Sequence, residues 1–122
     1  MYRKQPREPG RWVNQRLLVG TVQVVEYQPS FVDGLGGKTV FPQMLDHARR
    51  LIDGALVAGL ADVAAAVRLL AERNRVIAEG AGACPVACAL SGQAGPGKIA
   101  CVVSGGNIDM MKLCTILRGG SS

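Results

Sequence analysis

Four residues that could do chemistry follow an apolar run near the end of the sequence. After residues 99–103 come Ser104, Gly105, Gly106 and Asn107, so that a hydroxyl, two glycines and an amide stand together. Ligands gather at the carboxyl ends of the strands in open α/β sheets, so this order is typical of a ligand site. Glycines leave room for a ligand at the backbone, and the serine hydroxyl can donate a hydrogen bond. The alternative is a tight turn in which Ser104 and Asn107 cap the next helix.

Two other glycine-rich stretches resemble nucleotide-binding loops but do not complete one. Gly92 and Lys98 have the spacing of a P-loop, but Ile99 stands where a Ser or Thr must bind Mg²⁺. The stretch also precedes a predicted strand, whereas a P-loop follows one. Residues 36–39 fail as well, because position 32 is Val32 and the first glycine is missing. The sequence therefore argues against nucleotide hydrolysis.

Ser104 at a strand-to-helix turn could also act as the nucleophile of a hydrolase. The nucleophile elbow requires G-x-S-x-G, and position 102 is Val102. His47 is the single histidine and would have to be the general base, although no spacing supports that role. Hydrolysis by this route is kept as a second alternative function.

The cysteines form no metal-binding pattern. Cys84 and Cys88 lie four residues apart, Cys101 and Cys114 follow, and no C-x-x-C occurs. We expect no metal site and interpret the cysteines as buried, reduced thiols. With no secretory segment and no apolar run of membrane-spanning length, this usage predicts a reducing, cytoplasmic location and no membrane partner.

The positive charge of the chain is concentrated at its start. The net charge is +5, and residues 1–16 hold a single acidic residue, Glu8, among the basic side chains Arg3, Lys4, Arg7, Arg11 and Arg16. No aromatic interleaving accompanies these charges, so we prefer a flexible, solvated leader over a nucleic-acid arm and expect no nucleic-acid partner.

Helix-like and strand-like segments alternate in the remaining residues. Apolar residues at helical spacing predict helices over 42–53, 60–73 and 81–91, and a last helix that begins after Asn107 or Asp109. Apolar or β-branched stretches predict extended segments or strands at 17–27, 55–59, 75–80 and 99–103. This alternation indicates an α/β fold, a partial parallel sheet with flanking helices, in one domain over residues 17–122.

Three stretches occur in an order that resembles one enzyme family. They are FVDGLGGKTVFP, LLAERNRVIAEGAGA and KIACVVSGGNID. Together they resemble the C-terminal part of the pyridoxal-phosphate-dependent threonine/serine dehydratase family, over about residues 25–118. The resemblance implies the large domain of a fold-type II pyridoxal-phosphate enzyme, of the tryptophan-synthase-β type.

The resemblance also implies roles for individual residues. In that family the serine of S-G-G-N faces the pyridine nitrogen of the cofactor, which places Ser104 there. A hydroxyl leaves the ring neutral and a weaker electron sink, which suits β-elimination from serine or threonine. Gly105, Gly106 and Asn107 would form the same wall, and Glu79 would lie near the ring. A strand-end carboxylate paired with an arginine is the alternative for Glu79.

Other parts of the family pattern are incomplete here. Asp33 and Gly34 match a loop at the mouth of the active site, or else form an ordinary turn. The family's lysine-bearing segment, phosphate loop, ring-contacting asparagine and substrate-carboxylate loop have no match. Four lysines lie in other contexts: Lys4, Lys38, Lys98 and Lys112.

The resemblance predicts a truncated or split member of the family. Full-length members deaminate serine or threonine to a 2-oxo acid and ammonia, but no catalytic residue is identified here, since the cofactor lysine is absent. We expect the chain alone to be inactive, and we expect its partner to be either a second copy of itself in a homo-oligomer or a complementary N-terminal chain. The first alternative is a non-catalytic structural or interaction protein that forms a homo-oligomer.

Overall fold

The chain forms four α-helices and two short helical turns within the residues that the structure describes. The structure is a computed structural model that describes residues 29–35 and 39–120. The elements are the 3₁₀ turn η1 (Asp33–Leu35), α2 (Pro42–Leu51), α3 (Leu60–Leu69), the π-helical turn η2 (Leu70–Asn74), α4 (Gly80–Leu90) and α5 (Met110–Leu117). The predicted leader at residues 1–16 and the predicted strand at residues 17–27 lie outside the described residues.

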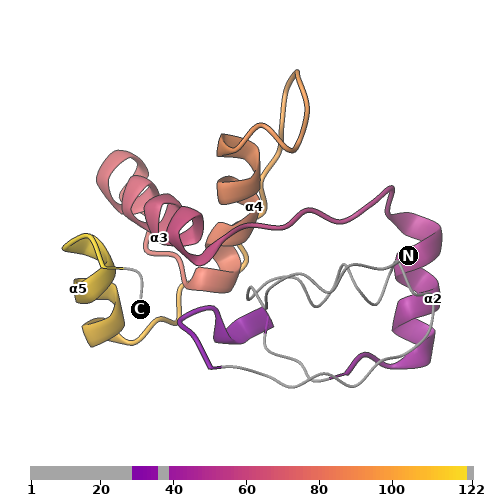
Figure 1. Cartoon of the computed structure of the whole chain (residues 1–122), viewed down its shortest axis with the longest axis horizontal. Coiled ribbons are helices and arrows are strands. Elements are labelled where there is room, and N and C mark those ends of the chain that lie inside the picture. The colour runs from indigo at the N-terminus through magenta and orange to yellow at the C-terminus, as the bar shows by residue number, and fades with distance from the viewer. Residues whose placement is uncertain (1–28, 36–38, 121–122) are drawn as a thin grey trace, which may run out of the picture.

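Helices α3, α4 and α5 lie together and enclose the core (Figure 1). The apolar stripe that the sequence predicts over residues 60–73 faces inward: Val63, Ala64 and Val67 are at most 1% exposed, Leu70 is buried, and Leu60 is partly buried against the core. Ala83 and Ala87 of α4, Leu113 and Ile116 of α5, and Phe31 and Val32 ahead of η1 complete this core. The helices predicted over 60–73 and 81–91 are thus confirmed, with bounds shifted slightly.

Helix α2 begins as the sequence predicts but stands apart from the other helices (Figure 1). Pro42 occupies its first turn, where the missing N–H of proline costs no hydrogen bond. Arg49 and Arg50 lie in its last turn, where positive charge complements the helix dipole. His47 is exposed on this helix, and its side chain forms no hydrogen bond with Ser104.

Helix α3 continues into η2 and ends at a residue in the left-handed conformation. Arg75 has φ of 57° and terminates the helix. Its side chain turns back, and Nη1 donates a hydrogen bond of 2.6 Å to the carbonyl of Glu72. The chain then runs in extended form toward α4.

The predicted sheet is not formed by the described residues. Residues 55–59, 76–79 and 99–103 are extended, but none of them belongs to a strand. Val102 is 73% exposed and Ile77 is 48% exposed, whereas a central parallel strand would bury both. A strand exists only through bonds to a neighbouring strand. Within the described residues, the main-chain bond from Glu79 N to Gly105 O, at 3.0 Å, joins the segment at residues 76–79 to the turn that follows residues 99–103.

Asp109 caps helix α5, which settles a choice that the sequence left open. Its Oδ1 accepts hydrogen bonds of 3.0 Å from the backbone N–H groups of Met111 and Lys112. The alternative in which Ser104 and Asn107 cap this helix is therefore wrong. Among the helices of the described segments, none is long and apolar enough to cross a bilayer.

Candidate functional site

Three segments that are distant in sequence meet at the N-terminal end of α4. They are residues 31–34 around η1, residues 79–82 at the start of α4, and residues 104–106 after the extended segment. Each belongs to one of the three stretches that carried the family resemblance. The structure therefore brings Gly34, Glu79 and Gly105 together, as the contacts below show.

The approach of α4 to residues 104–105 requires a glycine in the helix. A Cβ at Gly82 would lie 2.7 Å from the carbonyl oxygen and 3.1 Å from the nitrogen of Gly105. It would also lie 3.5 Å from the backbone nitrogen of Ser104. The same carbonyl oxygen of Gly105 accepts a 3.0 Å hydrogen bond from Glu79 N. Together these contacts fix the backbone next to Ser104.

The carboxylate of Glu79 lies directly over Gly105. A Cβ at Gly105 would be 2.5 Å from Glu79 Oε1 and 3.0 Å from its Cδ. On the other side, a Cβ at Gly34 would be 3.6 Å from the same Oε1 and 2.8 Å from Ala81 Cβ. Glu79 is half-buried, and no arginine in the described part of the chain forms an ion pair with it. The arginine-pairing alternative for Glu79 has no counterpart there.

Ser104 and Asn107 present polar side chains at the surface of this site. Both are exposed, and neither side chain has a hydrogen-bond partner within residues 29–35 and 39–120. The chain turns tightly at Asn107, since Ile108 N donates to the carbonyl of Gly106 at 2.9 Å. Gly106 itself abuts the carbonyl oxygen of Ile77. The Ser104 hydroxyl is consequently free to donate to a ligand.

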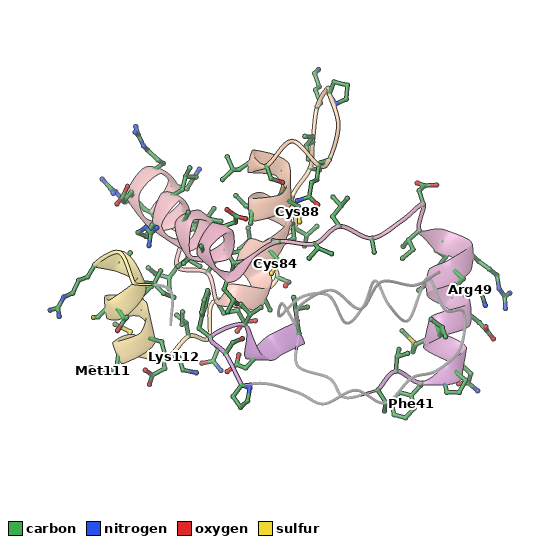
Figure 2. All side chains as sticks on the ribbon, in the orientation of Figure 1. Phe41, Arg49, Cys84, Cys88, Met111 and Lys112 are labelled. Carbon is green, nitrogen blue, oxygen red and sulfur yellow. The ribbon has the colours of Figure 1, made fainter. Side chains whose placement is uncertain are left out.

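A lysine lies beside η1, although no sequence motif indicated one there. Lys112 Nζ of α5 lies 3.8 Å from Asp33 Oδ2 of η1, and the side chains are 45% and 64% exposed. Figure 2 labels Lys112 on α5. The pairing depends on α5 folding back toward η1, so no local pattern could reveal it. An exposed pair of this kind adds little to stability.

No metal site accompanies these residues. No group of three or more His, Cys, Asp or Glu side chains among the described residues could hold a metal ion. The site therefore offers a hydroxyl, a carboxylate and backbone groups. That set suits an organic ligand with a hydrogen-bond acceptor.

The sequence of this chain is similar to those of known enzymes. The sequence profile of the family described as "Pyridoxal-phosphate dependent enzyme" matches residues 10–105. The L-threonine ammonia-lyase of Thermotoga maritima is 33% identical over 102 residues, which are 83% of this chain and 25% of that enzyme. The L-threonine ammonia-lyase of Geobacter sulfurreducens is 31% identical over 103 residues, or 83% and 26% of the two chains. The chain thus spans about a quarter of the length of these relatives.

Solved structures of the same kind share the fold. The crystal structure of a threonine deaminase from T.th. superposes with a TM-score of 0.76 and 27% sequence identity, over 83% of this chain and 37% of that one. Maize serine racemase superposes with a TM-score of 0.74 and 24% identity, over 89% and 36% of the two chains. The second likeness concerns the fold alone. The described segments thus follow the path of a fold-type II enzyme although they form no strand.

Proposed function

The chain belongs to the family of pyridoxal-phosphate-dependent enzymes, and from this premise we propose that residues 79 and 104–107 form the cofactor-contacting wall of a serine/threonine ammonia-lyase. The observation that carries the proposal is the unpartnered hydroxyl of Ser104 at the point where the three segments meet. The relatives that cover this region are named L-threonine ammonia-lyases, which supports an amino-acid substrate.

The residues present fit one face of this cofactor. The ring nitrogen of pyridoxal phosphate accepts a hydrogen bond, and Ser104 offers a donor with no competing partner in the described chain. Gly105 and Gly106 carry no side chain where a flat ring would approach. Their close contacts with Glu79 and Ile77 keep this surface in one shape. The amide of Asn107 adds a further polar group on the same exposed turn.

Residues 79 and 104–107 would hold the cofactor, which when bound would supply an electron sink for the elimination of water from serine or threonine. In our proposal Ser104 donates its hydroxyl proton in a hydrogen bond to the ring nitrogen and leaves that nitrogen neutral. The backbone of Gly105, held by Glu79 N–H and by Gly82, keeps the Ser104 side chain directed at the ring. The Glu79 carboxylate contributes a negative charge beside the ring.

These 122 residues do not, by our proposal, complete the catalytic site. The covalent attachment of the cofactor needs a lysine amine, and no lysine here lies in a segment that resembles the family's. Lys112 pairs with Asp33, and Lys98 is exposed on the turn after α4. We infer that a complementary N-terminal polypeptide supplies the lysine and the phosphate loop.

The extended segments support the need for a covering partner. Val102 and Ile77 are largely exposed, Ile99 is 44% exposed, and the backbone around them lacks a strand neighbour in the described chain. Exposed apolar side chains on unpaired extended backbone invite strand pairing. The single α/β domain predicted at residues 17–122 would then be completed by the sheet of the partner.

A chimera tests the proposal. The 102-residue region of the Thermotoga maritima enzyme that matches this chain would be replaced by the corresponding residues of this chain. We expect the purified chain alone to release no ammonia from threonine or serine above a no-enzyme control, and the chimera to release it. Ammonia from the chain alone, or a folded chimera that binds the cofactor without any turnover, would contradict the proposal.

The second candidate is a non-catalytic protein that forms a homo-oligomer. The observation in its favour is the exposure of large apolar side chains on several elements, such as Phe41 at 77% and Met111 at 75%, both labelled in Figure 2. Two copies could cover these surfaces through a two-fold interface. A dimer in light scattering, together with an inactive chimera, would favour this candidate. A monomer at micromolar concentration would remove it.

A further inference from the structure

Three cysteines lie around helix α4, and the proposed function uses none of them. Cys84 and Cys88 lie one helical turn apart, and Figure 2 shows both along α4. Cys101 belongs to the extended segment that follows the turn at residues 91–98. Its Sγ lies 3.5 Å from the carbonyl oxygen of Pro85 in α4. The segment that leads to Ser104 therefore contacts α4 through a thiol.

The contact with Pro85 places Cys101 against the part of α4 that the Cys88 side chain covers. A helical side chain covers the turn on the N-terminal side of its own Cα, so Cys88 lies over the turn that contains Pro85. Burial raises the pKa of Cys88, and the negative charges of Cys101 and Asp62 act in the same direction. The effect of Cys101 on the pKa of Cys88 agrees with the contact that places Cys101 at Pro85.

Cys84 is less suited to pair with Cys101. Its thiol donates a hydrogen bond of 3.3 Å to the carbonyl of Gly80. Burial, followed by the neighbouring Cys88, raises the pKa of Cys84 to about 11. The raised pKa values lower the thiolate fraction of both Cys84 and Cys88 at neutral pH, so geometry decides between them: Cys101 contacts Pro85, in the turn that Cys88 covers.

We propose that Cys88 and Cys101 form a reversible disulfide in the presence of a hydroperoxide, and that this bond fastens the segment before Ser104 to helix α4. The half-exposed Cys101 is the attacking residue and the buried Cys88 resolves the intermediate. The proposal does not rest on cofactor binding, so it can stand or fall separately from the proposed function.

Hydrogen peroxide is the oxidant that converts the two thiols into the disulfide. The Cys101 thiolate attacks one peroxide oxygen, the O–O bond breaks, and hydroxide leaves to take up the proton that Cys101 released. The product at Cys101 is a sulfenic acid. Cys88 then attacks this sulfur, an S–S bond forms, the S–O bond breaks, and a second water leaves with the Cys88 proton. Two thiols are oxidised, and one peroxide is reduced to two waters.

The disulfide would act on the candidate site because the segment is weakly held. Residues 99–103 have no strand partner in the described chain, and their backbone connects directly to Ser104. Gly92, Gly95 and Gly97 all have positive φ in the turn that leads into the segment, so the turn can adjust while the sulfurs close. A bond at Cys101 would limit the motion of Ser104 and Gly105 relative to α4.

The test is oxidation of the full chain, followed by mass spectrometry. The reduced chain is treated with one equivalent of hydrogen peroxide, digested without reduction, and mapped. We expect a loss of about 2 Da, from the two hydrogens that an S–S bond removes, and a linked peptide pair that contains Cys88 and Cys101. Cys101→Ser should abolish this product, while Cys114→Ser, on the exposed face of α5, should retain it.

Other outcomes would overturn the proposal. A disulfide that joins Cys84 to either partner, a Cys114-linked dimer as the main product, or oxygen added to isolated cysteines would each contradict the assigned pair. The mapping on the unsubstituted chain decides this even where a variant fails to fold. Hydrogen exchange supplies the second readout: oxidation should slow the amides of Ser104 and Gly105, and unchanged exchange would refute the fastening role.

Discussion

A methyl group added at Gly82 should weaken the fold by disturbing the backbone of the candidate site. The Cβ of Gly82→Ala would lie 2.7 Å from the carbonyl oxygen of Gly105, a distance at which one of the two must move. The obstacle is main chain, so no side-chain rotation relieves it. Movement of Gly105 also strains the hydrogen bond from Glu79 N to Gly105 O.

The magnitude follows from three contributions to the free energy of unfolding. Overpacking of a close contact costs about 1–3 kcal/mol. Weakening the Glu79–Gly105 bond costs up to about 1 kcal/mol. Alanine is more favourable than glycine in a helix interior by about 1 kcal/mol, which offsets part of this loss in the free energy of unfolding. The sum is a net loss of about 2 kcal/mol for Gly82→Ala.

Urea unfolding followed by far-ultraviolet circular dichroism measures this loss. Gly54→Ala is the matched control, because its Cβ would meet nothing within 4 Å and its φ is not positive. That control should be neutral or stabilising by up to about 1 kcal/mol. If Gly82→Ala were as stable as Gly54→Ala, residues 104–105 would not pack on α4 as described, and the reasoning would be refuted.

Three further predictions concern single residues. Asp109→Ala should lower the free energy of unfolding by about 1 kcal/mol because it removes the cap of α5. Asp109→Asn, which can still accept these hydrogen bonds, should keep most of the stability of the unsubstituted chain in thermal unfolding. Arg68→Met keeps the alkyl packing but loses the 2.9 Å bond to the carbonyl of Ile116, which should cost about 1 kcal/mol in urea; no change would contradict that bond. Cys84 should react with iodoacetamide at pH 8 more slowly than the exposed Cys114, and equal rates would contradict its burial. Because its pKa is raised from 9.0 to about 11, the folded state holds this proton more tightly, so Cys84 stabilises the fold fully below pH 9 and progressively less toward pH 11.

The helices could be predicted from the sequence because their signals are local. The stripe of Val63, Ala64, Val67 and Leu70 recurs at helical spacing, and each member is buried in α3 or η2. The start of α2 at Pro42 follows from the geometry of proline alone. Such patterns need no knowledge of what the helix packs against.

The strands could not be predicted in the same way. Residues 99–103 have the apolar character of a buried strand, yet Val102 is 73% exposed and no ladder forms in the described chain. Whether an extended segment becomes a strand depends on a neighbour that is distant in sequence or lies on another chain. The apolar composition of residues 99–103 shows that the segment is suited to pair as a strand. It does not show whether a partner strand is present.

Only part of the candidate site could be predicted from the sequence. The ordered motifs indicate Ser104, Gly105 and Glu79 as site residues, and the structure brings the three together. Their roles toward a cofactor stay predictions. The contact between Lys112 and Asp33 was missed, because it depends on how α5 returns to η1. Likewise, Asp109 could be separated from Asn107 as the cap only once the helix start was known.

The affinity of the chimera for pyridoxal phosphate tests the central claim most directly. Ser104→Ala removes one neutral hydrogen bond, which corresponds to a rise in Kd of about 2- to 12-fold. Ser91→Ala is the matched control, since its hydroxyl bonds the Cys88 carbonyl at the far end of α4. We predict a weaker cofactor complex for Ser104→Ala and an unchanged one for Ser91→Ala. Equal affinity in the Ser104→Ala and unsubstituted chimeras would contradict the placement of this hydroxyl at the ring nitrogen.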